Sequence, residues 1–175
     1  VPAAMLMTLL RSSFRNEGRN ETSAKNLLCA VNDTMRVNFD ERLFATAICL
    51  IISPDGKYMS YAQAGHPRLI RIDGKDGKVQ NIEVSGIALG ILSDQNAFSK
   101  ILGEVTIPLI EKDRFFLYTD GLTEAFNPNK DAYGADRLLK LLDGDIGNTP
   151  EKISRKIIQD IKAFTQGAAY HDDLT

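Results

Sequence analysis

A short apolar run that ends at an Asp-Gly pair occupies residues 114–127, with the sequence RFFLYTDGLTEAFN. Residues 115–118 are apolar without interruption, which predicts a strand covered on both faces. Asp120-Gly121 follows after Thr119, and Asp-Gly is a strong turn signal. An Asp at the end of a buried strand directs its carboxylate out of a rigid scaffold, where a cation or a substrate can reach it.

More short strands are predicted upstream, at residues 43–53, 57–65, 68–73, 79–84 and 99–107. The first of them, LFATAICLIIS, is almost continuously apolar and ends at the turn signal Pro54-Asp55-Gly56. Short strands separated by turns indicate antiparallel pairing. The two continuous apolar runs also require packing on each side, because a one-sided antiparallel sheet would alternate apolar and polar residues.

Helical periodicity is found at both ends of the chain. Residues 3–14 and 24–35 each repeat apolar side chains at helical spacing and form a predicted helical hairpin. Leucines at 138–142 precede Gly144, a typical C-terminal stop. A last helix opens at Thr149-Pro150-Glu151 and is closed by Gly167. The order of helices, strands and helices predicts an α+β fold, and the length predicts one domain over residues 1–175.

The composition excludes several classes of protein. The 175 residues include 21 basic and 23 acidic ones, a net charge of −2, which argues against nucleic acid as a partner. Cys29 and Cys49 lie in apolar runs and are expected to be free thiols rather than disulfide or zinc ligands. No apolar run reaches the ~18–20 residues that span a bilayer. We therefore expect a soluble, cytoplasmic protein without membrane contact.

A second acidic site, Asp172-Asp173, lies in the final sequence HDDLT, ahead of what resembles the start of a strand. By itself Asp120-Gly121 is an ordinary turn, and Asp172-Asp173 is a solvated surface turn. The chain has only 2 histidines, so two carboxylate sites suit Mg²⁺ or Mn²⁺ better than zinc. A pair of such ions activates water for in-line attack on phosphorus. The chemistry is therefore phosphoester hydrolysis if the two acidic sites converge.

The sequence YTDGLTEAFNPNKDAYGADRLLKLL, residues 118–142, resembles the signature of a bacterial family. This family is the sporulation-protein-E-like and sigma-factor-regulator branch of the metal-dependent (type 2C) serine/threonine phosphatases. LFATAICLIIS, YAQAGHPRLI, ALGI at 88–91 and the terminal DDLT support the resemblance, in the family's order and over essentially the whole chain. The resemblance implies an α-β-β-α sandwich of two antiparallel sheets flanked by helix pairs.

The same resemblance implies roles for four residues. Asp120 and Asp172 would be ligands of a dinuclear Mn²⁺ or Mg²⁺ centre and would act in catalysis through the metal. Gly121 would permit the tight turn that presents Asp120. Asp173 would stand behind the ligands without binding metal itself.

Other polar residues are expected to be structural. Glu124 and Asn127 would shape the loop after Asp120, and His66 would be a satisfied loop histidine. His171 would cap the turn beside the acidic pair. Arg71 is expected, with two nearby lysines, in a solvated basic hairpin.

Two family segments lie outside residues 1–175. In the family, Gly-Asp-x-Ser-Gly-His-Gly precedes the V-P-A-A helix and its Asp bridges the two metals, whereas this sequence starts at Val1-Pro2-Ala3-Ala4. The strand that DDLT normally begins lies beyond Thr175. We therefore expect a truncated type 2C-like domain that lacks N-terminal strands and the last C-terminal strand. Such a chain should have little or no phosphatase activity of its own, and its exposed strand edges favour homo-oligomers.

The resemblance implies an enzyme of signal transduction and sigma-factor regulation. It would hydrolyse phosphoserine or phosphothreonine on a bacterial signalling protein, an anti-anti-sigma-type partner, by a metal-activated water. The alternative is a non-catalytic regulatory or scaffold domain of the same fold that binds a partner protein through the helical hairpin. The residues upstream of Val1 distinguish the two, because an Asp-Gly pair there supports the enzyme.

Overall fold

The computed structural model describes residues 3–38, 43–145, 147–168 and 173–175. They form two compact units, one from the described parts of 1–66 and 84–109 and the other from those of 67–83 and 110–175. Each unit has its own three-stranded antiparallel sheet and its own helices. The predicted α+β class with two antiparallel sheets is confirmed. Within the described ranges, no helix is both long and apolar enough to cross a membrane.

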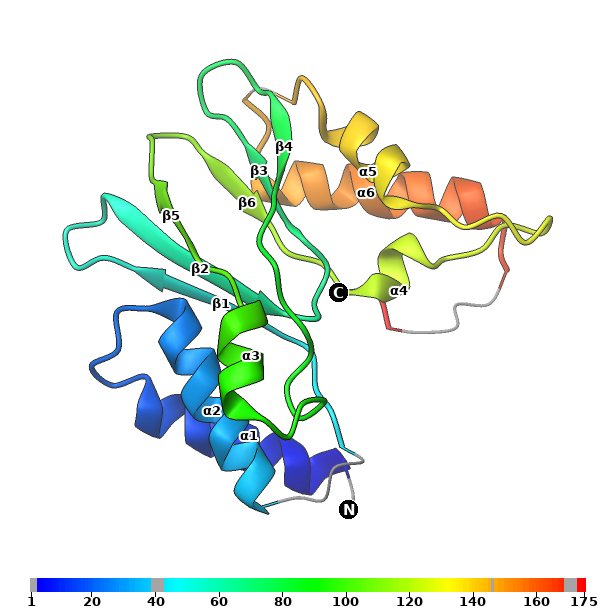
Figure 1. Ribbon diagram of the computed structural model, residues 1–175. Helices are drawn as coiled ribbons and strands as arrows, with labels where there is room; N and C mark the ends of the chain where they lie inside the picture. Colours follow the sequence, from blue (N-terminus) through cyan, green and yellow to red (C-terminus); the bar gives the residue numbers. More distant parts are fainter. Residues whose placement is uncertain (1–2, 39–42, 146, 169–172) are drawn as a thin grey trace. The chain divides into compact units, whose positions relative to one another are not determined.

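The first unit combines a helical hairpin with a sheet of order β1-β2-β5 (Figure 1). Its helices are α1 (Ala3–Glu17), α2 (Ala24–Asn38) and α3 (Gln95–Ile101). Its strands are β1 (Ala47–Ile52), β2 (Tyr58–Ala64) and β5 (Val105–Pro108). Cys49 of β1 lies opposite Ala62 of β2, and Met59 of β2 lies opposite Ile107 of β5.

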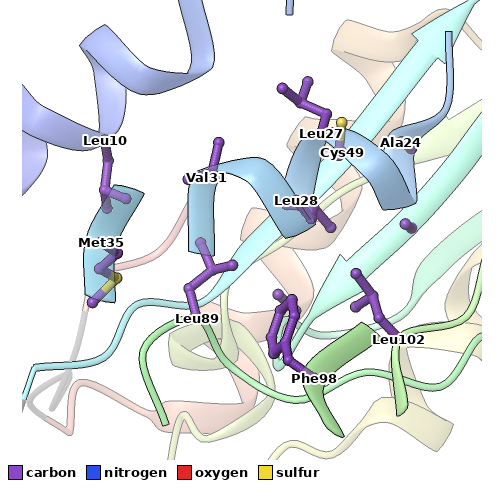
Figure 2. Close-up of a cluster of buried hydrophobic side chains, with 12 residues drawn as sticks. Leu10, Ala24, Leu27, Leu28, Val31, Met35, Cys49, Leu89, Phe98 and Leu102 are labelled. Atoms are coloured by element: carbon purple, nitrogen blue, oxygen red, sulfur yellow. The ribbon is translucent and has the colours of Figure 1, made fainter. Parts of the chain in front are cut away.

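Helix α2 supplies more buried residues to this unit's core than any other element, because its apolar stripe lies against β1 and β2. Figure 2 shows Leu28 and Val31 of α2 gathered with Leu89 and with Phe98 of α3. Cys49 is also buried there, and burial raises the pKa of its thiol to about 11. Both cysteines are free, as predicted.

A buried amide of α2 joins this helix both to α3 and to the loop that precedes α3. Asn32 is fully buried, and its Nδ2 donates to Gln95 Oε1 at 2.9 Å. Asn32 Oδ1 accepts a hydrogen bond from Gly90 N at 2.9 Å, and Gln95 Nε2 donates to the Cys29 carbonyl at 2.9 Å. Because each amide group has a partner, these polar side chains fix the packing of α2 instead of destabilising the core.

The second unit has a sheet of order β4-β3-β6, formed by β3 (Leu69–Ile72), β4 (Val79–Ile82) and β6 (Arg114–Phe116). Its helices are α4 (Asp120–Thr123), α5 (Ala135–Leu142) and α6 (Pro150–Thr165). Ile70 and Ile72 of β3 share one core with buried residues of α5 and α6, among them Leu138 and Ile157. Thr149 caps α6 and Pro150 opens it, as predicted.

Arg71 is buried in this unit, so its assignment to a solvated basic hairpin is wrong. Arg71 Nη2 lies 2.6 Å from Asp113 Oδ2, as an ion pair rather than an aligned hydrogen bond. The side chain of Asp113 is 2% exposed. It also accepts backbone hydrogen bonds from Gly74 N at 2.9 Å and Ile110 N at 3.2 Å. A charge on a strand can thus be buried when its partner comes from another segment.

Three strand predictions need correction. The run at 115–118 is not a strand covered on both faces, because β6 is an edge strand of half-buried residues that ends at Phe116, and Leu117 is 41% exposed. Residues 99–101, predicted as strand, are the last residues of helix α3, which Asp94 caps by accepting a hydrogen bond from Asn96 N. Strand β5 begins only at Val105. Strand β1 is mostly half-buried rather than covered on both faces. It is an edge strand of its sheet, and Ile52 at its end is 61% exposed.

Candidate metal site

Asp120 starts a one-turn helix, and residues 117–119 connect it to Phe116, where β6 ends. Thr119 is extended, with φ −86° and ψ 158°, and serves as the N-cap residue of α4. Asp120 is the first residue of α4 and is exposed, and its Oδ1 accepts a hydrogen bond from the buried Gly121 N–H at 3.0 Å. The expected turn is therefore a helical turn that leaves the Asp120 carboxylate accessible.

Buried neighbours on both sides fix the position of Asp120. Tyr118 is 6% exposed and stacks on Phe116 with ring centroids 5.7 Å apart. Leu122 is 4% exposed and belongs to the core beneath α5 and α6. The backbone carbonyl of Asp120 accepts hydrogen bonds from Glu124 N at 2.8 Å and Thr123 Oγ1 at 3.1 Å. The carboxylate thus stands on a short segment that is anchored at each end.

The end of the chain returns to this segment through Thr119. Thr119 Oγ1 donates to the Asp173 carbonyl at 2.9 Å, and Thr119 N donates to the Thr175 carbonyl at 3.2 Å. Thr175 N donates in turn to Thr119 Oγ1 at 3.3 Å. The residue before Asp120 and the residue after Asp172 are therefore in direct contact.

The remaining candidates occupy different places. Asp172 and His171 lie outside the described residues. Asp173 is exposed and holds the terminal segment through its carbonyl oxygen. His66 belongs to the first unit, where its backbone N–H donates to Gln63 Oε1 at 2.9 Å.

Asn127 shapes the loop after α4, as predicted. Its Oδ1 accepts from the backbone N–H groups of Asn129 at 3.0 Å and Asp131 at 2.9 Å, while its Nδ2 donates to Asp131 Oδ2 at 3.0 Å. These bonds close a compact turn and leave the amide engaged within the loop. Asn127 is thus structural.

Thr119 lies within the sequence YTDG, but the sequence alone gave it no role. A threonine before an Asp carries no signal of a partner 54 residues further along the chain. The sequence also gave no sign of a polar cluster that joins α5 to α6. In this cluster Asp160 accepts hydrogen bonds from Tyr133 Oη at 2.7 Å and from Arg137 Nε at 2.8 Å. Arg137 lies over the rings of Tyr133 and Phe164, which locks α5 against α6.

The side chains at this site can offer oxygen ligands only. Within the residues that the structure describes, no group of three or more His, Cys, Asp and Glu side chains is arranged to hold a metal ion. The structure shows the Asp120 carboxylate exposed, and Thr119 holds residues 173–175 next to the segment that carries it. Carboxylate and carbonyl oxygens are the ligands that Mg²⁺ and Mn²⁺ prefer.

A family model described as Stage II sporulation protein E (SpoIIE) matches residues 1–175. The chain belongs to the SpoIIE family. Protein IcfG of Synechocystis sp. (strain ATCC 27184 / PCC 6803 / Kazusa) is 27% identical to it over 140 residues, which cover 78% of this chain and 20% of IcfG. This SpoIIE-family chain thus spans about a fifth of the length of that curated relative.

Solved structures show which fold the SpoIIE-family chain has. The SiaA-PP2C domain of Pseudomonas aeruginosa matches with a TM-score of 0.79 at 19% identity, covering 99% of this chain and 68% of that one. The manganese-presoaked phosphatase domain of the cell fate determinant SpoIIE from Bacillus subtilis matches with a TM-score of 0.62 at 18% identity, covering 97% and 69%. The chain therefore has the PP2C-type phosphatase fold that its motifs implied.

Proposed function

We propose that this SpoIIE-family chain carries the catalytic part of a metal-dependent serine/threonine protein phosphatase, with Asp120 and Asp172 as metal ligands. One observation carries the proposal. The hydrogen bonds of Thr119 bring residues 173–175 to the start of the helical turn that carries Asp120. Convergence of the two acidic sites is the condition under which their carboxylates can serve one centre.

The chain's own residues would hold Mn²⁺ or Mg²⁺ and orient it. The exposed Asp120 carboxylate has one oxygen fixed by the Gly121 N–H, which limits its rotation. Asp172 would add a second carboxylate, and Asp173 would keep its neighbour in place through its backbone carbonyl. When bound, the metal supplies a water of lowered pKa for in-line attack on phosphorus.

The substrate that we propose is a phosphoserine or phosphothreonine on a bacterial signalling protein of the anti-anti-sigma type, in the cytoplasm. Membership in the SpoIIE family and the motif resemblance support this substrate class. Because the family's bridging Asp precedes V-P-A-A, a polypeptide limited to residues 1–175 would hold metal weakly. It should show little or no hydrolysis of p-nitrophenyl phosphate with Mn²⁺.

The test uses the natural polypeptide that contains this chain, a phosphoserine peptide and Mn²⁺. Asp120→Asn and Asp172→Asn should each abolish metal-dependent phosphate release. Asp143→Asn is the matched control, because Asp143 is an exposed carboxylate at the end of α5. Release of phosphate at the wild-type rate by Asp120→Asn would overturn the assignment.

The alternative function is a non-catalytic regulatory domain that binds a partner through the helical hairpin. One observation favours it: the outer face of α1 is exposed and carries grooves. The two functions differ in a simple result. A regulatory domain would lack metal-dependent phosphate release in the natural polypeptide, and the Asp of the Gly-Asp-x-Ser-Gly-His-Gly segment would be replaced there.

A further inference from the structure

The outer face of α1 carries two adjoining grooves, and none of the residues that line them belongs to the proposed phosphatase site. One, of about 560 Å³, is lined by Ala4, Met5, Thr8, Leu9, Ser12 and Asn38. The other, of about 630 Å³, is lined by Thr8, Arg11, Ser12, Arg15, Asn16 and Arg19. Thr8 and Ser12 line both, so the grooves continue into each other along one helix face.

The second groove is strongly basic. Arg11 and Arg15 are exposed and one helical turn apart, and Arg19 continues the row just past the end of α1. In the described part of the chain, no carboxylate forms an ion pair with any of these three arginines. Like charges four residues apart destabilise a helix, so Arg11 and Arg15 do not stabilise α1 when their face is exposed only to solvent.

The first groove offers apolar surface next to the arginines. Met5 is 60% exposed and Leu9 is half-buried. Methionine side chains adapt their shape to different partners and are common at binding surfaces. An exposed apolar groove that adjoins a charged row is typical of an interaction site rather than of a plain solvated helix.

We propose that this face of α1 binds an acidic amphipathic helix of a partner protein. Apolar side chains of that helix would enter the groove at Met5 and Leu9, and its carboxylates would pair with Arg11, Arg15 and Arg19. The helical part of the face runs from Ala4 to Asn16, about 18 Å, which matches about three turns of a bound helix.

Charge complementarity favours this occupant over two others. A second copy bound through the same face, with the two α1 helices antiparallel, would set the arginines of one copy against the apolar groove of the other. A lipid surface would have to bury Thr8 and Ser12, which lie in the middle of the face, in its acyl region. An acidic helix has carboxylates for the arginines and apolar groups for the groove.

The probe for the test is a labelled synthetic helix of about five turns. It is built from Leu, Ala and Glu, with Leu at helical spacing on one face and Glu on its flanks. Fluorescence anisotropy should show binding to chain 1–175 that weakens at least about tenfold when NaCl rises from about 0.05 M to about 0.3 M. The same peptide with every Glu replaced by Lys should not bind.

The decisive variant is Arg11→Glu/Arg15→Glu/Arg19→Glu, which should lose binding of the acidic peptide. Lys140→Glu/Lys152→Glu/Arg155→Glu is the matched control, because it makes the same charge change on exposed positions of α5 and α6. The control should bind as the wild type does. If the decisive variant loses its helical circular dichroism, the milder Arg11→Gln/Arg15→Gln/Arg19→Gln replaces it.

Several results would overturn the proposal. One is no binding of the acidic peptide to the wild type, and another is equal weakening in the decisive and control variants. Binding to vesicles of neutral and anionic phospholipid without peptide binding would assign the face to a membrane. A dimer in sedimentation that dissociates in the decisive variant would assign it to a second copy. None of these readouts depends on phosphatase activity, so the proposed function stands or fails separately.

Discussion

The Thr119 hydroxyl donates a hydrogen bond of 2.9 Å to the backbone carbonyl oxygen of Asp173, 54 residues further along the chain. The same hydroxyl accepts a hydrogen bond from Thr175 N at 3.3 Å. One side chain therefore fixes the acidic terminal segment beside the segment that presents Asp120. Its removal should affect the metal site without touching a proposed ligand.

Thr119→Val keeps the shape of the side chain but removes its donor and acceptor. We expect Mn²⁺ affinity of chain 1–175 to fall by about threefold to tenfold, because a net hydrogen bond contributes about 0.5–1.5 kcal/mol. Thr119→Ser restores the hydroxyl and should bind Mn²⁺ as the wild type does. Titration calorimetry measures both variants, and equal affinity of Thr119→Val and wild type would show that Thr119 does not position the site.

The buried ion pair of Arg71 and Asp113 gives a prediction on stability. Asp113→Ala leaves the buried guanidinium with only the more distant Asp73 Oδ2, at 3.7 Å, and should lower the free energy of unfolding by about 3 kcal/mol. The double variant Arg71→Met/Asp113→Leu should lose less, because neither charge remains. Urea unfolding at neutral pH measures both. A double variant that is less stable than Asp113→Ala would contradict this account.

Asp160 predicts how stability depends on acid. The hydrogen bond from Arg137 lowers the pKa of the Asp160 carboxyl below its usual value. A lowered folded-state pKa stabilises the fold above the unfolded-state pKa, and this stabilisation is lost as the pH falls through the folded-state value. We therefore expect thermal stability to drop on acidification below pH ~4, and Asp160→Asn to reduce that dependence. An unchanged acid dependence in Asp160→Asn would assign the loss to other carboxyl groups.

The sheet edges predict self-association. Strands β1 and β5 are the edges of the first unit's sheet, and β1 exposes Ile52 at its end. Unpaired edges with exposed apolar side chains favour pairing between chains. Light scattering of chain 1–175 should therefore show species larger than a monomer, and Ile52→Lys should reduce them. A monodisperse monomer of the wild type would count against the prediction.

Local pattern predicted most elements of the fold, because helix periodicity, capping residues and turn signals act over a few residues. Thr149 and Pro150 at the start of α6 are an example. Local pattern cannot predict partners that are distant in the sequence. Arg71 was assigned to the surface because only the pairing of β3 with β6 brings Asp113 beside it. The strand predicted at 99–107 is wrong for its first half, because Ile101 ends helix α3 and Leu102 caps it. Its last residues, 105–107, belong to β5.

The candidate site divides in the same way. Residue chemistry and motif resemblance selected Asp120, and the structure shows it exposed as the first residue of the helical turn α4. No sequence signal connected Thr119 to Asp173, since hydrogen bonds between distant segments depend on the whole fold. The arginine row of α1 was not predicted from the sequence, because its exposure and the adjoining groove depend on how the helix packs.

Calorimetric titration of Mn²⁺ into chain 1–175 tests the metal site most directly. The wild type should bind Mn²⁺ weakly but measurably, Asp120→Asn and Asp172→Asn should each lower this affinity at least about tenfold, and Asp143→Asn should leave it unchanged. Circular dichroism confirms that each variant folds. Wild-type affinity in Asp120→Asn or Asp172→Asn would contradict the assignment of that residue as a ligand.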